Sequence, residues 1–160
     1  MAEGEGAADD KSDIVAGVPH GPAPATDPAW AGWQSWIGDR FEDHTGPFFF
    51  REEADGTIRC AFRAGPQHMN GGGHMHGGCM LTFADYSLFM IGNKAMPDGG
   101  GVTVSLNAEF IGPAHIGELV VATGEVTRAG GSLVFLRGKI EAEGRAVMTF
   151  SGVVKRIRRR

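Results

Sequence analysis

The sequence feature that most constrains the fold is the segment over residues 77–93, GGCMLTFADYSLFMIGN, which predicts one helix that is apolar on almost every side. At about 3.6 residues per turn its large apolar side chains leave no broad polar face, and such a helix is normally buried inside a domain. Asp85 is the only charged residue in it. Because burying a lone carboxylate costs free energy, we expect Asp85 to have a function rather than to be only a structural carboxylate.

A glycine-rich segment over residues 70–78 leads into this helix. The first N–H groups of a helix have no intrahelical partner, so they can bind an anion or a polarised carbonyl. Gly77 in addition lets a substrate approach the backbone closely. A helix start with free donors and a carboxylate two turns further on together predict an active site. The residues that we expect to contact the substrate are Gly78, Thr82 and Phe89.

Composition narrows the class of protein. A chain of 160 residues with 42% hydrophobic and 21% charged residues predicts one globular domain with a sizeable core. The net charge of −4 argues against a nucleic-acid-binding protein. The two cysteines, Cys60 and Cys79, indicate no disulfide framework, and neither a signal peptide nor an apolar run of about 18 residues is visible. We therefore expect a cytoplasmic protein that does not enter membranes.

The chain divides into four stretches by pattern. Residues 1–28, rich in Ala, Gly, Asp and Pro, predict a disordered tail, and 158–160 is a basic end. Over 29–44 the spacing of Trp30, Ile37 and similar residues predicts a short amphipathic helix. Its tryptophans either dock this helix onto the domain or line an acyl pocket. We expect the main domain to span 45–157.

Within the main domain the pattern predicts strands before and after the helix. Apolar and polar residues alternate in each stretch, as expected for half-buried strands. The predicted strands cover 47–51, 57–63, 102–110, 118–128, 132–141 and 145–157. Since nothing resembles alternating βαβ units, this order predicts an α+β fold in which an antiparallel sheet wraps around one long central helix. One sheet does not easily surround a helix that is apolar on every side, so the pattern also indicates an oligomer.

The residues around the helix start resemble the hotdog-fold thioesterases of the phenylacetate-pathway (PaaI) type. The similar positions are Asn70, Gly73, His76, Gly77, Gly78 and Asp85, the Val-Thr pair at 102–103, and the aromatic, Pro-Ala and Gly positions within 110–117. The resemblance covers about residues 45–155. It implies the hotdog fold and hydrolysis of acyl-CoA thioesters.

Carried over to this sequence, the resemblance implies a role for each matching residue. Asp85 would be the general base or nucleophile, and the Gly77 N–H would polarise the thioester carbonyl. Asn70 would hold the carbonyl or the attacking water, His76 would orient the loop and the substrate, and Thr103 would position the water. The residues themselves leave open that His76 only caps the helix and that Asn70 only shapes a turn.

Two further side chains, Thr82 and Ser105, are alternatives to Thr103. A hydrogen bond from Thr82 or from Thr103 would hold Asp85 ionised. Ser105, on the same predicted strand, is an alternative to Thr103 as the residue that positions the water.

Helix geometry restricts how Gly77 and Asp85 could act together. Eight residues of helix separate them by about 12 Å, which an aspartate side chain does not span. If both are catalytic, Gly77 of one chain must lie beside Asp85 of an antiparallel partner, giving two equivalent sites in an isologous dimer. The known shared-site dimers of the family agree with this hypothesis, which predicts a homodimer or a homotetramer made from two dimers.

A group of possible metal ligands, His68, His74, His76 and Cys79, is spread over the loop and the helix start. Closed zinc sites usually have tighter spacings of two to four residues in both halves. We therefore expect neither a metal nor an organic cofactor.

The basic residues from Lys155 to Arg160 have three interpretations: a site for the phosphates of coenzyme A, a solvated chain end, or a nucleic-acid-seeking tail. The negative net charge argues against the third.

The predicted function is hydrolysis of an acyl-CoA to a free acid and CoA. A non-catalytic hotdog protein that binds or senses acyl-CoA is the alternative from another class, although binding alone would not require Asp85. An enoyl-CoA hydratase on the same fold is the enzymatic alternative, but the paired Asp and His of such enzymes are not evident. Neither the acyl group nor the carrier, CoA or a carrier protein, follows from the sequence.

Overall fold

The structure is a computed structural model that describes residues 19–97 and 100–157. The predicted basic end at 158–160 lies outside the described residues. The strands are β1 (Gly21–Pro24), β2 (Gln34–Ile37), β3 (Phe49–Glu52), β4 (Ile58–Arg63), β5 (Gly101–Phe110), β6 (Leu119–Gly130), β7 (Leu133–Ala142) and β8 (Arg145–Arg156). The helices are α1 (Arg40–Thr45) and α2 (Gly77–Ile91), with 3-10 turns η1 (Pro28–Trp30), η2 (Pro66–His68) and η3 (Asn93–Ala95).

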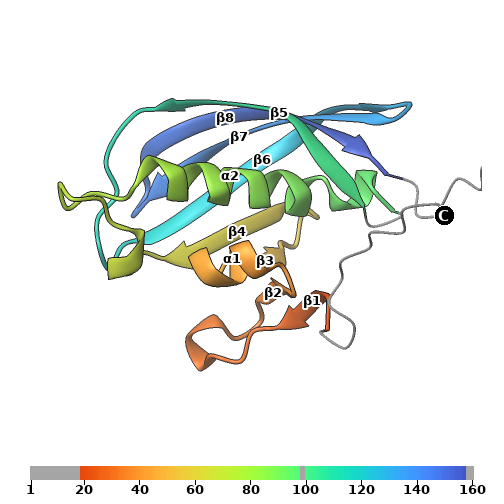
Figure 1. The fold of residues 1–160 in the computed structure, drawn as a ribbon. Helices are drawn as coiled ribbons and strands as arrows, with labels where there is room; N and C mark the ends of the chain where they lie inside the picture. Colours follow the sequence, from red (N-terminus) through yellow and green to blue (C-terminus); the bar gives the residue numbers. More distant parts are fainter. Residues whose placement is uncertain (1–18, 98–99, 158–160) are drawn as a thin grey trace, which may run out of the picture.

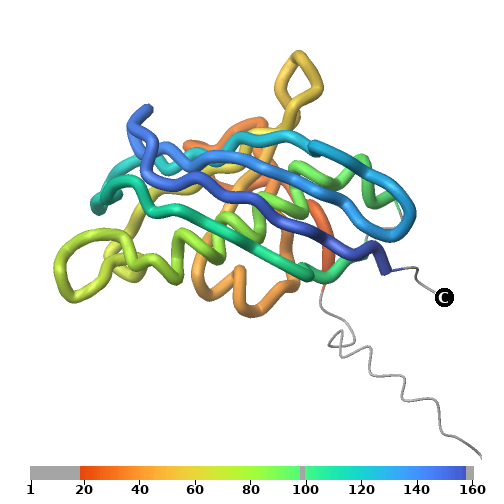
Figure 2. Tube along the Cα trace, turned by 90° about the horizontal axis from the view of Figure 1, so that it is seen from above, coloured from red at the N-terminus to blue at the C-terminus, as the bar shows by residue number. Residues whose placement is uncertain are grey.

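The described strands form one antiparallel sheet in the order β1-β2-β3-β4-β6-β7-β8-β5. Figure 1 shows that this sheet curves around α2, which crosses its concave face. Viewed from above, β5 and β8 cross over α2 at an angle (Figure 2). The predicted α+β fold, with a sheet around one long helix, is confirmed. None of the described helices has the length and hydropathy needed to cross a bilayer.

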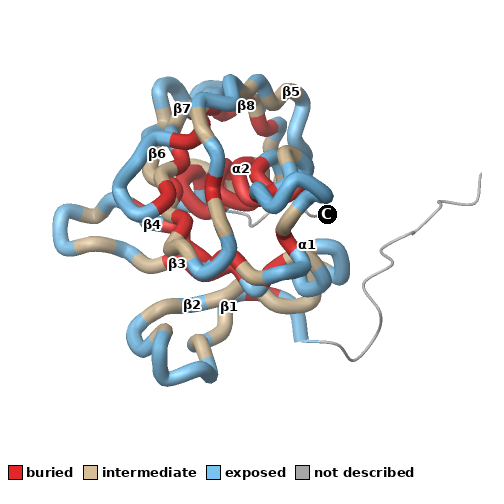
Figure 3. Tube along the Cα trace, turned by 90° about the vertical axis from the view of Figure 1, so that its left-hand side faces the viewer, coloured by how far each residue is buried: buried red, intermediate tan, exposed pale blue. Residues whose placement is uncertain are grey.

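Helix α2 supplies the centre of the core. It begins at Gly77 as predicted and ends at Ile91, two residues before the expected end. Figure 3 shows the buried residues gathered around it. Packing is close, because a side chain at Gly152 of β8 would overlap Leu88 of the helix. Fully buried apolar side chains such as Phe83 and Leu88 account for why this apolar segment forms the core helix.

One stripe of α2 stays uncovered in the single chain, so the prediction that the helix is buried on every side is only partly right. The positions that are not fully buried are Gly77, Gly78, Leu81, Thr82, Asp85 and Phe89. Their spacing of three and four residues places them on one face of the helix. This face, the open stripe of α2, contains Asp85 and all the helix positions expected to contact the substrate.

Strand β5 forms one edge of the sheet and is also poorly covered. None of its ten residues is fully buried, and the side chains of Val102, Val104 and Phe110 are 46%, 59% and 55% exposed. Between Thr103 and Ser105 its pairing with β8 shifts by one residue, a β-bulge at Val104. This edge strand with exposed apolar side chains lies beside the open stripe of α2, because Thr103 of β5 hydrogen-bonds to Asp85 of that stripe.

The N-terminal part differs from the prediction. The structure does not contain the single amphipathic helix that was expected over residues 29–44. Residues 28–30 form η1, residues 34–37 form β2, and only residues 40–45 form the helix α1. The tryptophan spacing reflects packing against the sheet rather than helical periodicity. Trp30 stacks on Phe49 of β3 with ring centroids 4.3 Å apart.

The predicted disordered tail also needs correction for its last ten residues. Residues 1–18 lie outside the described part, but residues 21–24 form β1, which pairs antiparallel with β2 and extends the sheet. Two of the four β1 residues, Pro22 and Pro24, are prolines. Proline has no backbone N–H and is typical of edge strands.

Candidate active site

The carboxylate of Asp85 is held from strand β5. The Thr103 hydroxyl donates a hydrogen bond of 2.6 Å to Asp85 Oδ1. The other candidate donor, Thr82, donates instead to the Gly78 carbonyl at 2.9 Å. The structure thus brings together two of the predicted site residues that lie 18 positions apart in the chain, and it shows Thr103, not Thr82, as the hydrogen-bond donor to Asp85.

The bulge in β5 explains why Thr103 and not Ser105 contacts Asp85. In a regular strand both side chains would point to the same face. The extra residue at Val104 breaks this alternation and redirects the side chains on either side of it. Ser105 accepts a hydrogen bond from Asn107 at 3.1 Å.

The first turn of α2 presents one free backbone donor. His76 is the N-cap, and its Nδ1 accepts a 2.8 Å hydrogen bond from the Gly78 N–H. Among the hydrogen bonds between described residues, the Gly77 N–H donates none. A Cβ on Gly77 would lie 3.3 Å from two ring carbons of Phe110, so the absence of a side chain at position 77 leaves room for that ring. The free donor therefore belongs to Gly77, whereas Gly78 is engaged.

Asn70 shapes the loop before the helix. Its Oδ1 accepts hydrogen bonds from Gly72 N–H at 2.8 Å and His74 N–H at 3.3 Å. Its backbone N–H also donates to the His74 carbonyl at 2.7 Å. The asparagine closes an Asx turn, one of the two interpretations that the sequence left open.

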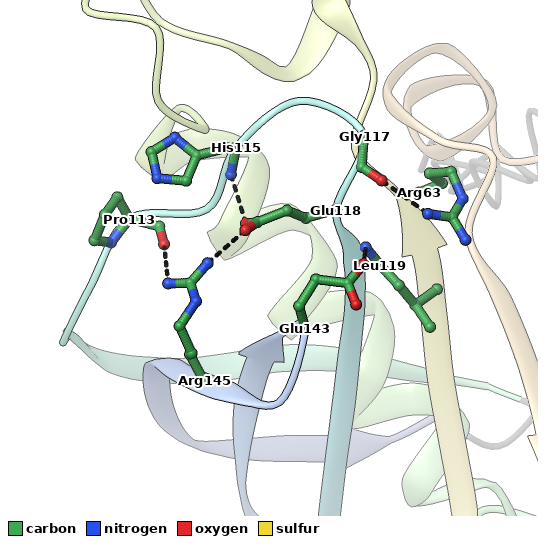
Figure 4. A network of polar contacts seen from close by, with 8 residues as sticks. All are labelled: Arg63, Pro113, His115, Gly117, Glu118, Leu119, Glu143 and Arg145. Atoms are coloured by element: carbon green, nitrogen blue, oxygen red, sulfur yellow. Dashed lines mark hydrogen bonds and ion pairs between the residues drawn. The ribbon is translucent and has the colours of Figure 1, made fainter.

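A polar network fixes the neighbouring loop over residues 111–118 (Figure 4). Glu118 accepts from the His115 N–H at 2.8 Å and forms an ion pair with Arg145. The Met75 N–H donates to the Ala114 carbonyl at 2.8 Å, and the rings of His74 and His115 lie 5.1 Å apart. These contacts tie the loop at 70–76 to the loop at 111–118. They thereby fix the position at which α2 begins.

Sequence reasoning missed one acidic residue with an unusual pKa, on the short helix α1. Glu42 lies on α1, which packs against α2. Burial, and after it the negative charges of Asp39, Asp85 and Asp43, raises the pKa of Glu42 to about 7. Carboxyl groups with a raised pKa cluster at functional sites. Asp39 caps this helix, but nothing in the sequence indicates which of its side chains is buried where α1 packs on α2.

The three histidines among the possible metal ligands have separate partners, and the cysteine thiol is buried. His68 is buried, with Nδ1 accepting from the Gly65 N–H at 2.8 Å and Nε2 donating to the Thr45 carbonyl at 2.7 Å. His76 caps α2, and the ring of His74 lies edge-to-face against that of His115. Burial raises the pKa of the Cys79 thiol to about 11, which disfavours the thiolate that a metal would bind. Within residues 19–97 and 100–157, no three His, Cys, Asp or Glu side chains are arranged to hold a metal.

The predicted site residues therefore form two groups, one near the middle of α2 and one at its start. Asp85 and Thr103 make one group, and His76, Gly77 and Gly78 make the other, with the Asn70 turn beside it. Gly77 and Asp85 are both within α2, so the separation of about 12 Å along the axis applies. Phe89 is half-buried on the same open stripe, one turn beyond Asp85.

Comparison with known proteins assigns the chain to a family. The thioesterase superfamily model matches residues 72–149, a range that includes both groups of site residues except Asn70. Protein PA0474 of Pseudomonas aeruginosa, whose name assigns it provisionally to the esterases, is 33% identical over 112 residues, covering 69% of this chain and 84% of that protein. Acyl-coenzyme A thioesterase 13 of Homo sapiens is 30% identical over 113 residues, covering 66% and 81%. The chain belongs to the thioesterase superfamily.

Solved structures agree with this assignment. The TT0310 protein of Thermus thermophilus is 25% identical with a TM-score of 0.65, covering 74% of this chain and 98% of that one. The BH2602 protein of Bacillus halodurans, crystallised with CoA, is 26% identical with a TM-score of 0.63, covering 69% and 74%. The hotdog fold that the sequence resemblance implied is confirmed.

Proposed function

We propose that this protein hydrolyses acyl-CoA thioesters to a free acid and CoA, with Asp85 as the general base or nucleophile. The observation that carries the proposal is the Asp85 carboxylate, held by Thr103 on the one face of the core helix that the chain leaves uncovered. Two further findings support it: one relative is named acyl-coenzyme A thioesterase 13, and one similar structure contains CoA. The motif around Asn70 and Asp85 favours the PaaI type within the superfamily.

The chemistry needs a base and an oxyanion donor. Asp85 takes a proton from a water molecule as the water oxygen attacks the thioester carbon, or its own oxygen attacks and water later hydrolyses the anhydride. The carbonyl oxygen becomes negative and accepts a hydrogen bond from the Gly77 N–H at the positive end of α2. When the C–S bond breaks, the sulfur leaves with the electron pair as the CoA thiolate and takes up a proton.

A second copy of the chain would complete the site. Gly77 and Asp85 of one helix lie too far apart to act on one carbon, whereas antiparallel helices of two copies would bring them together. The open stripe of α2 and the apolar edge strand β5 offer a surface that such a partner would cover. We therefore infer a homodimer with two shared sites, or a tetramer of two such dimers.

The first experiment measures thiol release from short-chain, long-chain and aromatic acyl-CoA esters by the wild type and by Asp85→Asn. Loss of a general base or nucleophile should lower kcat by about 10²–10⁴-fold. Size-exclusion chromatography and circular dichroism of both proteins check that the variant keeps its fold and assembly. Equal turnover by Asp85→Asn would refute the assigned base. Tight binding of CoA esters without turnover by the wild type would instead support an acyl-CoA-binding protein.

A further inference from the structure

The loop over residues 111–118 is anchored differently at its ends and in its middle. At the end that follows β5, the Ile111 N–H donates to the Val147 carbonyl at 2.8 Å. At the end that precedes β6, the Gly117 N–H donates to the Ala64 carbonyl at 2.8 Å. Because these bonds join backbone groups, they fix the two ends of the loop whatever side chains it carries.

The middle of the loop is held by two side chains. Arg145, the first residue of β8, donates from one guanidinium nitrogen to the Pro113 carbonyl at 3.3 Å and from another to the Glu118 carboxylate (Figure 4). The second carboxylate oxygen of Glu118 accepts from the His115 N–H at 2.8 Å. Arg145 and Glu118, together called the loop clamp, thus hold the backbone on both sides of Ala114.

The residue between these contacts is the one that meets the chain just before α2. The carbonyl of the buried Ala114 accepts from the Met75 N–H at 2.8 Å. Two positions further on, Gly77 carries the N–H that serves as oxyanion donor in the proposed hydrolysis. A second anchor comes from η2, where the His68 carbonyl accepts from the His76 N–H at 2.8 Å. Two backbone bonds therefore set the direction of the helix start, and the loop clamp controls one of them.

We propose that Arg145 and Glu118 are positioning residues for this hydrolysis: by fixing Ala114 they aim the Gly77 N–H at the carbonyl oxygen of the substrate. The inference rests on the function proposed above. An oxyanion donor is effective when its N–H already points to the place where negative charge develops, so a small shift of the helix start lowers the rate. The two side chains act through the backbone and do not touch the substrate, unlike Asp85.

The loop clamp depends on geometry as well as on charge. The forked guanidinium of Arg145 reaches two separate oxygens, and Glu118 uses both of its carboxylate oxygens. Exchange of the pair, Glu118→Arg with Arg145→Glu, keeps the opposite charges but leaves the Pro113 carbonyl without its donor and the His115 N–H without its acceptor. We expect the exchanged pair to stay impaired, and a return to wild-type kcat would overturn the geometric role.

The kinetic test compares Glu118→Gln, Arg145→Met and the double variant with the wild type, using the acyl-CoA ester that turns over best. Each single substitution should lower kcat about five- to thirtyfold and leave KM within about twofold, because the oxyanion donor acts in the transition state. The double variant should lose no more than the more impaired single variant, since either substitution opens the same clamp. Fully additive losses would contradict a joint action of the two side chains.

Glu143→Gln and Arg63→Met are the matched controls, because they make the same kinds of change next to the loop clamp (Figure 4). The Glu143 carboxylate accepts from the Leu119 N–H at 2.8 Å, at the start of β6. Arg63 donates to the Gly117 carbonyl at 2.8 Å, at the loop end that backbone bonds already fix. Both variants should keep kcat within about twofold of the wild type.

A second measurement follows the helix start without turnover. Amide hydrogen exchange, resolved by nitrogen-15 NMR, reports the Met75 N–H, whose acceptor the clamp holds, and the His76 N–H, whose acceptor lies on η2. We expect Glu118→Gln and Arg145→Met to speed exchange at Met75 by about tenfold and to leave exchange at His76 within about twofold. His76 is thus an internal control in the same molecule.

The outcomes separate this inference from the proposed function. Unchanged exchange at Met75, or equal acceleration at Met75 and His76, would overturn the link from the loop clamp to the helix start. Selective acceleration at Met75 with unchanged kcat, while Asp85→Asn is inactive, would overturn the positioning role and leave the proposed function intact. A wild type that releases no thiol would refute the proposed function and with it the positioning role, whatever the exchange rates show.

Discussion

At the scale of single residues, Glu42 links the stability of the fold to pH. The folded-state pKa of this carboxyl is raised from 4.5 to about 7, so between these values the folded chain holds a proton that the unfolded chain has released. Wild-type stability should therefore fall as pH rises through this window. Compared with the wild type, Glu42→Gln should gain about 1–2 kcal/mol in the free energy of unfolding from about pH 5 to pH 8.5, after discounting for partial exposure.

Urea denaturation at fixed protein concentration measures this difference at each pH. Asp43→Asn, which removes an exposed charge from the same helix, is the control: the Asp43 charge is the smallest of the causes that raise the pKa of Glu42, so this variant should change the pH dependence much less. A stability difference between Glu42→Gln and the wild type that stays constant over this range would contradict the raised pKa.

The site residues differ in how far the sequence alone could predict them. Asp85 and Gly77 stand out because a charge in an apolar helix and a glycine at its start are local features. Choosing Thr103 over Ser105 requires the bulge at Val104, which depends on pairing with β8, more than 40 residues away. Glu42 depends on how α1 packs on α2, and no periodicity in the sequence records that contact.

At the scale of the element, the start of α2 offers a direct test of the proposed oxyanion donor, the Gly77 N–H. Gly77→Pro removes the N–H, and proline is well tolerated at the first position of a helix. His76, with φ −65° and ψ 134°, already has the conformation that a residue before proline prefers. We expect the helix to form and kcat to fall by about 10²–10³-fold.

Gly77→Ala is the matched control for this substitution. It keeps the N–H and adds the same Cβ beside Phe110, an exposed ring that can move by the few tenths of an ångström required. Steady-state kinetics should show Gly77→Ala within about tenfold of the wild type and far above Gly77→Pro. Equal losses in both variants would mean that the space at Gly77, and not its N–H, matters for turnover.

Elements with a clear pattern were predictable, and those defined by distant contacts were not. The core helix and the six strands from β3 to β8 follow from periodicity, with ends within about two residues. The region 29–44 carries tryptophans at helical spacing, yet Trp30 stacks on Phe49 and Trp36 lies in β2. Aromatic packing onto a sheet edge and short-strand pairing with β1 override the local pattern there.

At the scale of the whole molecule, a shared site predicts complementation between inactive chains. In a one-to-one mixture of Asp85→Asn and Gly77→Pro chains, half of the dimers are mixed, and each mixed dimer has one site with both residues intact. Activity should recover to about one quarter of the wild-type value after co-expression or refolding together. Thiol release from the mixture, measured against each variant alone, tests this.

The reverse mixture is the control. Wild type combined with the double variant Gly77→Pro/Asp85→Asn should give about one quarter of full activity if sites are shared, since every site of a mixed dimer then lacks one group. A site contained within one chain would instead give about one half in this mixture and none in the first. The two mixtures together therefore distinguish a site shared between two chains from a site contained within one chain.

The two edges of the sheet also differ in what they allow the molecule to become. At β1, Pro22 and Pro24 lack the N–H groups that a further strand would bind, while β5 at the opposite edge keeps a full set. In the terms of polymer chemistry, the described fold is a monofunctional unit with one reactive end and one blocked end. Growth through the sheet should therefore terminate after a single addition, which protects a chain with an exposed, apolar edge strand from propagating into a fibre.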